Sequence, residues 1–427
     1  MAGSKPGKRN KSGKLTAEIT VNGSGTAPAV ASPRAVSAGK KAKPVEVVRV
    51  RGSYDMVLLL LTIVLSLMGI VTVFSASYAY SYTFYGNSYQ YIKNHVIYVL
   101  VGYAALFVLM HISYNLIKRF TVLAYVFSLG LLMVVLLYGG VLGVARRWIT
   151  VFGVSVQPSE FAKLTVVLML ALYISRNQNR IVNYSNFGMS TLYGIIVPAI
   201  ILALPCILIL LENHFSGTLI VFAIGAVIIF ASGARPGWMA AAAGTAFVII
   251  LVLILSSSYA RTRVDMLFNP ENYDPKGEIW QTLQGLNAIG SGGLFGVGIG
   301  NSKQKYLFVS QPQNDFIFSI LCEETGFAGA LLVIILFILL IWRGFRIAMR
   351  APDTYSSLVA LGITSKIAVQ TILNIAVVTN TVPNTGVSLP FFSCGGTAVF
   401  MQLAEIGILL SISRYTYVDN IPEESAA

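Results

Sequence analysis

Long apolar runs dominate the chain, and short polar turns separate them. A helix of about 20 apolar residues crosses the hydrocarbon core of a bilayer. Ten such runs lie near residues 55–76, 95–113, 121–141, 158–174, 191–211, 216–233, 237–256, 316–342, 357–380 and 394–413, and only ENHF separates the fifth run from the sixth. The pattern predicts an all-α polytopic membrane protein of about ten transmembrane helices.

Two outer connections are longer than the others, one near residues 142–157 and one at residues 257–315. A loop of nearly sixty residues between helices 7 and 8 is unlike a spacer, since long loops usually serve binding or catalysis. We therefore expect a long extracellular loop that carries the functional site. The expected organisation is a tail at 1–53, a transmembrane domain at 54–415 and a short tail at 416–427.

Composition and charge narrow the class of protein. The chain is 56% hydrophobic and only 11% charged, which excludes a soluble enzyme. Its three Cys and three His form neither a disulfide framework nor a zinc motif of recognised spacing. The net charge is +13, and residues 1–51 hold +9 of it, as 11 Lys and Arg less two Glu. This segment has too few bulky apolar residues to order itself, so we expect a disordered tail.

The distribution of basic residues predicts the orientation in the membrane. With the N-terminal tail inside, every inner turn is basic, as the positive-inside rule requires. The C-terminus then also lies in the cytoplasm, in a bacterial cell membrane. No cleavable signal peptide is recognisable, so the first span would be the targeting signal. For the basic tail, attraction to anionic lipids or a topological role is favoured over nucleic-acid binding. The inner basic residues are Lys118, Arg119, Arg176, Arg180, Arg235, Arg343, Arg346, Arg350 and Arg414.

A few polar side chains fall inside the apolar runs, where ionisable groups cost about 2.5 to 3.5 kcal/mol each by insertion scales. Gln157, Glu160 and Lys163 are spaced by three residues and share one helical face. The pair Glu160 and Lys163 could be an internal salt bridge or the wall of a substrate cavity. A second polar stripe, with a lysine at depth, marks the ninth run. It consists of Lys366, Gln370 and Asn374, and further buried candidates are Glu323, Glu324, Gln402 and Glu405.

Asp315 ends the long outer loop and precedes the apolar run that begins FIFS. Partial desolvation at the membrane boundary would raise the pKa of its carboxyl, which suits a general base. An N-cap of the following helix is the alternative. Basic pairs on the same side are Arg146 with Arg147 before Trp148, Arg261 with Arg263, and Lys303 with Lys305. They could bind phosphate or simply be solvated.

Two glycine-rich segments predict turns rather than a nucleotide site. GSGGLFGVGIG, residues 290–300, lacks the spacing, the preceding strand and the ribose acid of a dinucleotide fingerprint. Its glycines allow tight turns and close backbone approach. SCGGT, residues 393–397, predicts a sharp turn before the last span.

Three blocks of this sequence together resemble the SEDS family (shape, elongation, division and sporulation), which includes FtsW, RodA and SpoVE, with the FtsW and SpoVE branch favoured. They are ARRWITVFGVSVQPSEFAKL, NAIGSGGLFGVGIGNSKQKYLFVSQPQNDFIFSILCEETGFAGA and NIAVVTNTVPNTGVSLPFFSCGGTAVFMQLAEIGILLSISR. The resemblance implies that Asp315 is the catalytic aspartate. It implies substrate-binding roles for Arg147, Trp148, Gln157, Glu160, Lys163, Lys303, Lys305, Lys366, Ser393, Gly395 and Gly396.

The chain departs from the family pattern in three places. QPQND stands before the apolar run where relatives usually carry His-Thr, and ENHFSGT replaces QPDLGT, so that His214 could stand near the place of the family acid. Cys394 replaces the commonest Tyr of the closing motif. These departures leave the candidate base and the polar pair Glu160 and Lys163 in place.

The resemblance implies a peptidoglycan glycosyltransferase that joins lipid II to a glycan on undecaprenyl diphosphate, for division, elongation or sporulation. A flippase or transporter of a lipid-linked precursor is the alternative, and a non-catalytic scaffold is a third reading. Implied partners are a class B penicillin-binding protein, divisome or elongasome proteins and membrane lipids, without nucleic acid. No cofactor is certain, although a divalent cation (Mg or Mn) could assist, and the sequence indicates no metal ligands.

Overall fold

The computed structural model describes residues 52–138, 147–151, 154–183, 187–234, 258–277 and 279–415, together with residues 237, 240 and 244. The described residues belong to the compact unit Arg49–Ala427. Residues 1–51 of the tail expected at 1–53, the tail expected at 416–427, and nearly all of the seventh apolar run at 237–256 lie outside them. The proposed domain boundaries therefore stay predictions.

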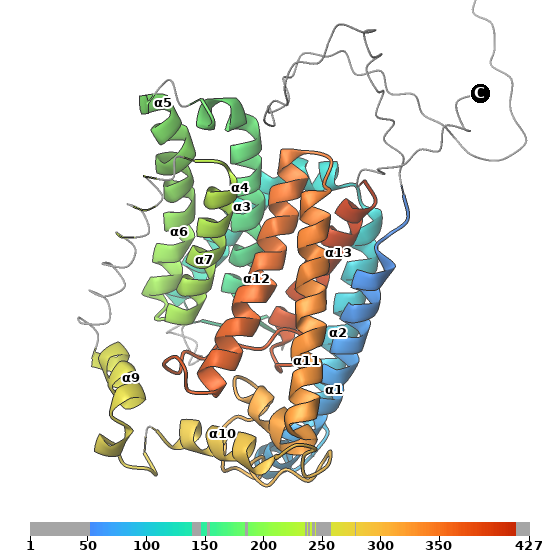
Figure 1. Ribbon diagram of the computed structural model, residues 1–427, viewed down its shortest axis with the longest axis vertical. Coiled ribbons are helices and arrows are strands. Elements are labelled where there is room, and N and C mark those ends of the chain that lie inside the picture. The colour runs from blue at the N-terminus through green and yellow to red at the C-terminus, as the bar shows by residue number, and fades with distance from the viewer. Residues whose placement is uncertain are drawn as a thin grey trace, which may run out of the picture. The chain divides into compact units, whose positions relative to one another are not determined.

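Helices account for most of the described chain (Figure 1). Eight helical segments are long and apolar enough to cross a membrane, and α7 is shorter. This confirms a polytopic helical fold, while the count of ten stays a prediction. The helices are α1 (Met56–Tyr85), α2 (Gln90–His111), α3 (Tyr114–Tyr138), α4 (Pro158–Ile181), α5 (Phe187–Thr191), the π-helix η1 (Leu192–Ile196), α6 (Val197–Leu211), α7 (Phe215–Ala231), α9 (Ser258–Phe268), the 3₁₀-helix η2 (Pro270–Asn272), α10 (Trp280–Ser291), α11 (Ile317–Met349), α12 (Thr354–Val378) and α13 (Gly396–Ser413).

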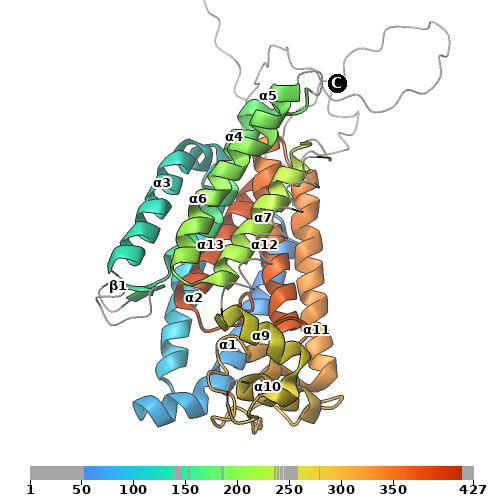
Figure 2. The same ribbon diagram turned by 90° about the vertical axis from the view of Figure 1, so that its left-hand side faces the viewer.

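The start of α1 and the end of α13 lie at the same end of the bundle. The amide of Gly52 donates to the carbonyl of Arg414 at 2.9 Å. Asp55 caps α1 by accepting from the amide of Leu58 and also binds Nε of Arg343 at 2.6 Å. Helices α9 and α10 and strand β1 (Ile149–Val151) lie at the opposite end (Figures 1 and 2). We call these the basic end and the site end.

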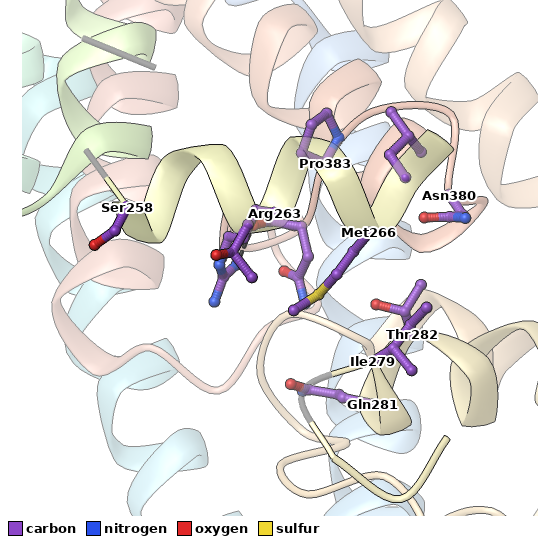
Figure 3. Close-up of a pocket in the computed structure, with 11 residues that line it drawn as sticks. Ser258, Arg263, Met266, Ile279, Gln281, Thr282, Asn380 and Pro383 are labelled. Carbon is purple, nitrogen blue, oxygen red and sulfur yellow. Dashed lines mark hydrogen bonds between the residues drawn. The ribbon is translucent and has the colours of Figure 1, made fainter. Parts of the chain in front are cut away.

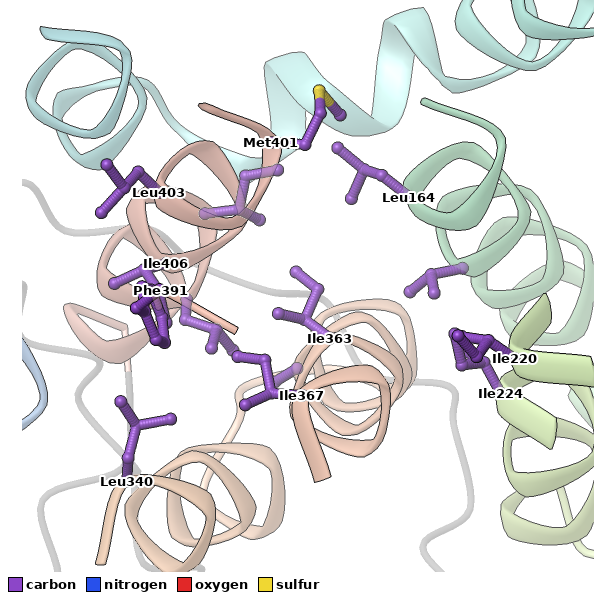
Figure 4. Packing of buried hydrophobic residues seen from close by; sticks show 14 of the residues in the cluster. Leu164, Ile220, Ile224, Leu340, Ile363, Ile367, Phe391, Met401, Leu403 and Ile406 are labelled. Carbon is purple, nitrogen blue, oxygen red and sulfur yellow. The ribbon is translucent and has the colours of Figure 1, made fainter. Parts of the chain in front are cut away.

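Helices α4, α12 and α13 form the centre of the bundle. Their apolar residues pack against those of neighbouring helices, for example Leu164, Ile363 and Met401 in Figure 4. By contrast, α2 and α3 leave large apolar side chains such as Leu100 and Leu123 more than 60% exposed. Burial of apolar surface against lipid explains this outward face, since a bilayer solvates leucine as well as a protein core does.

At the site end, short elements are fastened onto the helix ends. Strands β1 and β2 (Val154–Val156) form an antiparallel hairpin in which Ile149 pairs with Val156. Thr397 at the start of α13 donates to the carbonyl of Ser155 at 3.0 Å. In the loop after α10, Gly296 has φ +79, and a Cβ there would meet the carbonyl oxygen of Glu324 at 2.2 Å. The close backbone approach expected for this glycine-rich loop is thus confirmed.

Candidate functional site

Asp315 lies in the loop just before α11, and two segments hold the backbone of residues 313–315. Nδ2 of Asn374, on α12, donates to the carbonyl of Asp315 at 2.8 Å. The Ser393 hydroxyl donates to the carbonyl of Asn314 at 2.9 Å, and the amide of Cys394 donates to that of Gln313 at the same distance. These bonds fix the aspartate from α12 and from the loop that precedes α13. Helix α11 is capped by Phe316 without a side-chain bond, so the alternative reading of Asp315 as an N-cap is wrong.

The surroundings of the Asp315 carboxyl suit a base that works near neutral pH. Its side chain is only partly exposed. Burial raises the pKa of Asp315 to about 6, although the guanidinium groups of Arg263 and Arg147 oppose the rise. A general base is most effective when its pKa lies close to the working pH. The electrostatics therefore support the assignment of Asp315 as the candidate base.

Arg147 acts electrostatically on Asp315 and also binds the junction between α6 and α7. Its Nη2 donates to the carbonyl of Asn213 at 2.8 Å. Burial raises the pKa of Glu212 to about 8 despite Arg147, and burial lowers the pKa of His214 to about 4. Both groups are therefore uncharged at neutral pH. The junction confirms that the fifth and sixth apolar runs form two separate helices, α6 and α7. Arg147 is then the charged group of the cluster that it forms with Glu212 and His214. Arg146 lies outside the described residues.

Four charged side chains meet at the centre of the bundle. Nζ of Lys163 lies 2.5 Å from Oε1 of Glu160 within α4, which confirms that this pair interacts. Nζ of Lys366, on α12, lies 2.7 Å from Oε1 of Glu405 on α13 and 3.7 Å from Oε2 of Glu160. The four side chains are at most 5% exposed. They form a buried network that joins α4, α12 and α13, and we call it the central charge network.

The loop lysines differ from each other in their surroundings. Lys305 is buried, and its ammonium donates to Oε1 of Glu324, the hydroxyl of Ser75 and the carbonyl of Gly300 at 3.0, 3.0 and 2.5 Å. An ammonium has three donors, so all of them are used. Lys303 has an exposed side chain, while its amide donates to Glu323. Of the two, only Lys303 is placed to meet an external anion; the site assignments themselves stay predictions.

A further depression lies between α9, α10 and the loop after α12 (Figure 3). Arg263 lines it and also donates a hydrogen bond to the carbonyl of Asn384. The described residues contain no group of three or more His, Cys, Asp or Glu arranged to hold a metal ion. A divalent cation therefore stays an expectation without a protein ligand set.

Comparison with known proteins identifies the family to which this chain belongs. The model of the cell cycle protein family that comprises FtsW, RodA and SpoVE matches residues 55–418. The chain belongs to this family. It is 38% identical over 366 residues to stage V sporulation protein E of Bacillus subtilis, covering 85% of this chain and 98% of that protein. It is 36% identical over 362 residues to a probable peptidoglycan glycosyltransferase FtsW of Trichlorobacter lovleyi, covering 84% and 93%. This likeness supports the FtsW and SpoVE branch.

Two solved structures of FtsW/RodA/SpoVE-like chains share the fold. One is a chain of a peptidoglycan synthase complex, with TM-score 0.68, 26% identity and coverage of 86% of this chain and 99% of that one. The other is the rod shape determining protein RodA of Thermus thermophilus, with TM-score 0.62, 25% identity and coverage of 86% and 98%. Both support a membrane-embedded polytopic protein.

The SCGGT motif, residues 393–397, holds the backbone beside Asp315 through hydrogen bonds from Ser393 and Cys394. The SCGGT segment leads into α13, which begins at its Gly396, and Ser393 is buried. Its hydroxyl accepts from the amide of Leu389 at 2.7 Å while it donates to Asn314. A Cβ at Gly396 would lie 2.4 Å from the ring of Tyr98, so this glycine permits close packing. Substrate contacts of Ser393, Gly395 and Gly396 stay predictions, as do those of Trp148 and Gln157, which are partly exposed near the β-hairpin.

Three residues beside Asp315 did not appear among the site residues expected from sequence. Asn374 was recognised only as part of a polar stripe, and Arg263 only as one of several outer cations. Gly386 gave no signal, yet a Cβ on it would lie 3.1 Å from Oδ2 of Asp315. The contacts join residues about 50 to 70 positions apart in the chain, which periodicity within one helix does not reveal.

Proposed function

We propose that this chain is a peptidoglycan glycosyltransferase that polymerises lipid II, with Asp315 as the general base. Family relatives named probable peptidoglycan glycosyltransferase support the activity. The observation that carries the residue assignment is a half-buried carboxyl with a pKa of about 6, at the site end, within the field of two arginines. These surroundings meet the needs of proton abstraction from a sugar hydroxyl at neutral pH.

The reaction forms one glycosidic bond and breaks one. Asp315 takes the proton of the 4-hydroxyl of GlcNAc on lipid II, and that oxygen bonds to C1 of MurNAc at the end of the growing glycan. The bond from C1 to the undecaprenyl diphosphate breaks, and the diphosphate leaves with the electron pair. The anomeric centre inverts from α to β. Arg147 and Arg263 would stabilise negative charge near the reacting atoms, and such fixed cations are effective where water is scarce.

We also propose that the site end faces outward and that both termini lie in the cytoplasm. The basic residues expected inside the cell gather at the basic end, which supports this orientation. Among the described ones are Lys118, Arg119, Arg176, Arg180, Arg343, Arg346, Arg350 and Arg414. Lipid II would then bind with its polyprenyl tail against the apolar helices and its sugars at the site end, where attachment to one membrane depth aids positioning.

A class B penicillin-binding protein is the proposed partner, and the peptidoglycan synthase complex among the similar structures supports such an assembly. Contacts with divisome or elongasome proteins would follow from that partner. A Mg or Mn ion could neutralise the departing diphosphate, a role that metal ions perform elsewhere. None of the steps above depends on it.

Polymerisation of purified lipid II by the full-length chain tests the proposal, with moenomycin present to silence conventional transglycosylases. We expect glycan product from the wild type and none from Asp315→Asn, whose amide keeps the shape but cannot accept the proton. Full activity of that variant would remove Asp315 from the mechanism.

The same preparation separates the rival functions. A flippase would move lipid II between the leaflets of a vesicle without joining it, and Asp315→Asn would retain that movement. A scaffold would lack polymerisation, and the Asp315→Asn gene would still support growth of a depleted strain. Either result would replace the glycosyltransferase reading.

A further inference from the structure

A cavity of about 490 Å³ lies at the site end, within the size range of ligand pockets. Figure 3 shows Met266 of α9 facing Gln281 and Thr282 of α10 across it, with Asn380 and Pro383 from the loop after α12 closing one side. We call it the α9–α10 pocket. Its lining consists of Ser258, Thr262, Arg263, Met266, Leu267, Ile279, Gln281, Thr282, Asn380, Pro383 and Asn384.

The α9–α10 pocket adjoins the candidate base through two connections. Arg263 lines the pocket and at the same time acts on the carboxylate of Asp315. Asn384 also lines it and accepts a hydrogen bond from Arg263. Gly386, which lies against Oδ2 of Asp315, is only two residues further, a span of at most about 7 Å. A ligand in the pocket is therefore a short distance from the reacting atoms.

The lining favours an uncharged, hydrogen-bonding ligand. Six neutral polar residues supply hydroxyl or amide groups, and Arg263 is the only charged residue among the described residues that line the pocket. A diphosphate is usually bound by several cations, whereas the described lining holds one arginine, and a polyprenyl tail would leave the polar groups without partners. Sugar hydroxyls and acetamido groups match amide and hydroxyl side chains, which both donate and accept.

We propose that the α9–α10 pocket binds the growing glycan strand, at sugars beyond the GlcNAc–MurNAc disaccharide that reacts. This inference rests on the proposed glycosyltransferase function and adds a subsite for the donor. In the first coupling the donor is a single lipid II, which carries no further sugars to fill the pocket. Every later donor carries them. The pocket therefore retains the strand between additions and sets how long it grows.

Strand length tests this subsite separately from the chemistry. The full-length chain is given lipid II, and the rate of the first coupling is measured alongside the length distribution of the products. Gln281→Leu and Thr282→Val remove hydrogen-bonding groups from the pocket. Loss of one such bond raises strand dissociation about five-fold, so we expect strands about five-fold shorter with an unchanged first coupling. Asn287→Leu, at an exposed position of α10 outside the pocket, is the matched control.

A third pocket variant, Gln281→Trp, fills the pocket and should shorten the strands further. Thermal unfolding in detergent checks that each variant folds. Strands of wild-type length from folded pocket variants would overturn the inference, and so would an equal loss at the first coupling and at later ones, which would indicate a site for lipid II itself. Absence of polymer from the wild type would instead contradict the proposed function.

Discussion

Gly386 lies against the carboxylate of Asp315. A Cβ on Gly386 would stand 3.1 Å from Oδ2, and the glycine has φ +68, a left-handed conformation. Alanine would therefore crowd the carboxylate and strain the backbone by about 1 to 2 kcal/mol. If the displaced carboxylate loses that much transition-state stabilisation, we expect Gly386→Ala to polymerise lipid II about ten-fold more slowly.

The control for this substitution is Gly130→Ala on α3, where a Cβ would meet no atom within 4 Å. Alanine favours a helix over glycine, so this variant should keep full activity and stability. Equal rates for both variants would show that the close approach of Gly386 to Asp315 has no part in catalysis.

The dependence of the rate on pH should report the ionisation of Asp315. The base acts only when deprotonated, and its pKa is about 6, so the rate should rise as the pH increases through 6. Arg263 opposes the raised pKa, so removing its charge in Arg263→Gln should move the rising limb to higher pH. Arg263→Lys should leave the limb closer to its original position. The measurement is the initial polymerisation rate between pH 5 and 8.

Arg176→Gln, near the basic end of α4, is the control for the shift and should leave the limb in place. A pH profile of Arg263→Gln that is scaled down without a shift would mean that Arg263 holds structure or substrate and does not tune Asp315.

The sequence predicted those relationships that lie within one helix or follow from hydropathy. The spacing of Glu160 and Lys163 indicated a pair, and the structure contains it. Lys366 was recognised as a lysine at depth, but its partner Glu405 lies on another helix, and the sequence contained no sign of which acid it would meet. The positions of the helices along the chain were predicted for the same reason, because a bilayer requires long apolar stretches, although α1, α4 and α11 extend seven to nine residues beyond the predicted ends.

The surroundings of Asp315 could not be predicted in the same way. Asn374 on α12, and Gly386 and Ser393 in the loop before α13, contact Asp315 or its neighbour Asn314 through the tertiary structure. Lys305 differs in another way: an outer lysine suggested a phosphate ligand, whereas in the structure all three of its donors bind the protein, and its contact with substrate stays a prediction. The exposure of a side chain and its hydrogen-bond partners decide whether it can bind a ligand, and the residue type alone shows neither.

The central charge network should be required for stability. In Lys366→Met, Glu405 and Glu160 lose a shared partner at a site where their side chains are at most 5% exposed. Breaking a buried pair in this way typically lowers the free energy of unfolding by about 3 to 5 kcal/mol. The measurement is denaturation of the purified protein in detergent. Lys366→Met combined with Glu405→Gln should recover part of the loss, while Lys303→Ala, at an exposed side chain, should change little.

Glu212 should make the protein less stable as the pH rises. Its two carboxyl oxygens are buried without a hydrogen-bond partner among the described residues, and burial raises its pKa from 4.5 to about 8. Between these two values the folded state holds a proton that the unfolded state has released, so stability falls with rising pH and levels off above about 8. Glu212→Gln keeps the uncharged shape and should remove this fall.

Unfolding temperatures of the wild type and Glu212→Gln, measured from pH 5 to 9, give the difference curve. The difference isolates Glu212 from His214, whose lowered pKa acts in the opposite sense between about 4 and 6.5. We expect the two proteins to be similarly stable at pH 5 and the variant to be the more stable at pH 9. A wild type as stable as Glu212→Gln at pH 9 would mean that Glu212 ionises freely in the folded protein. The assignment of an uncharged junction between α6 and α7 would then be wrong.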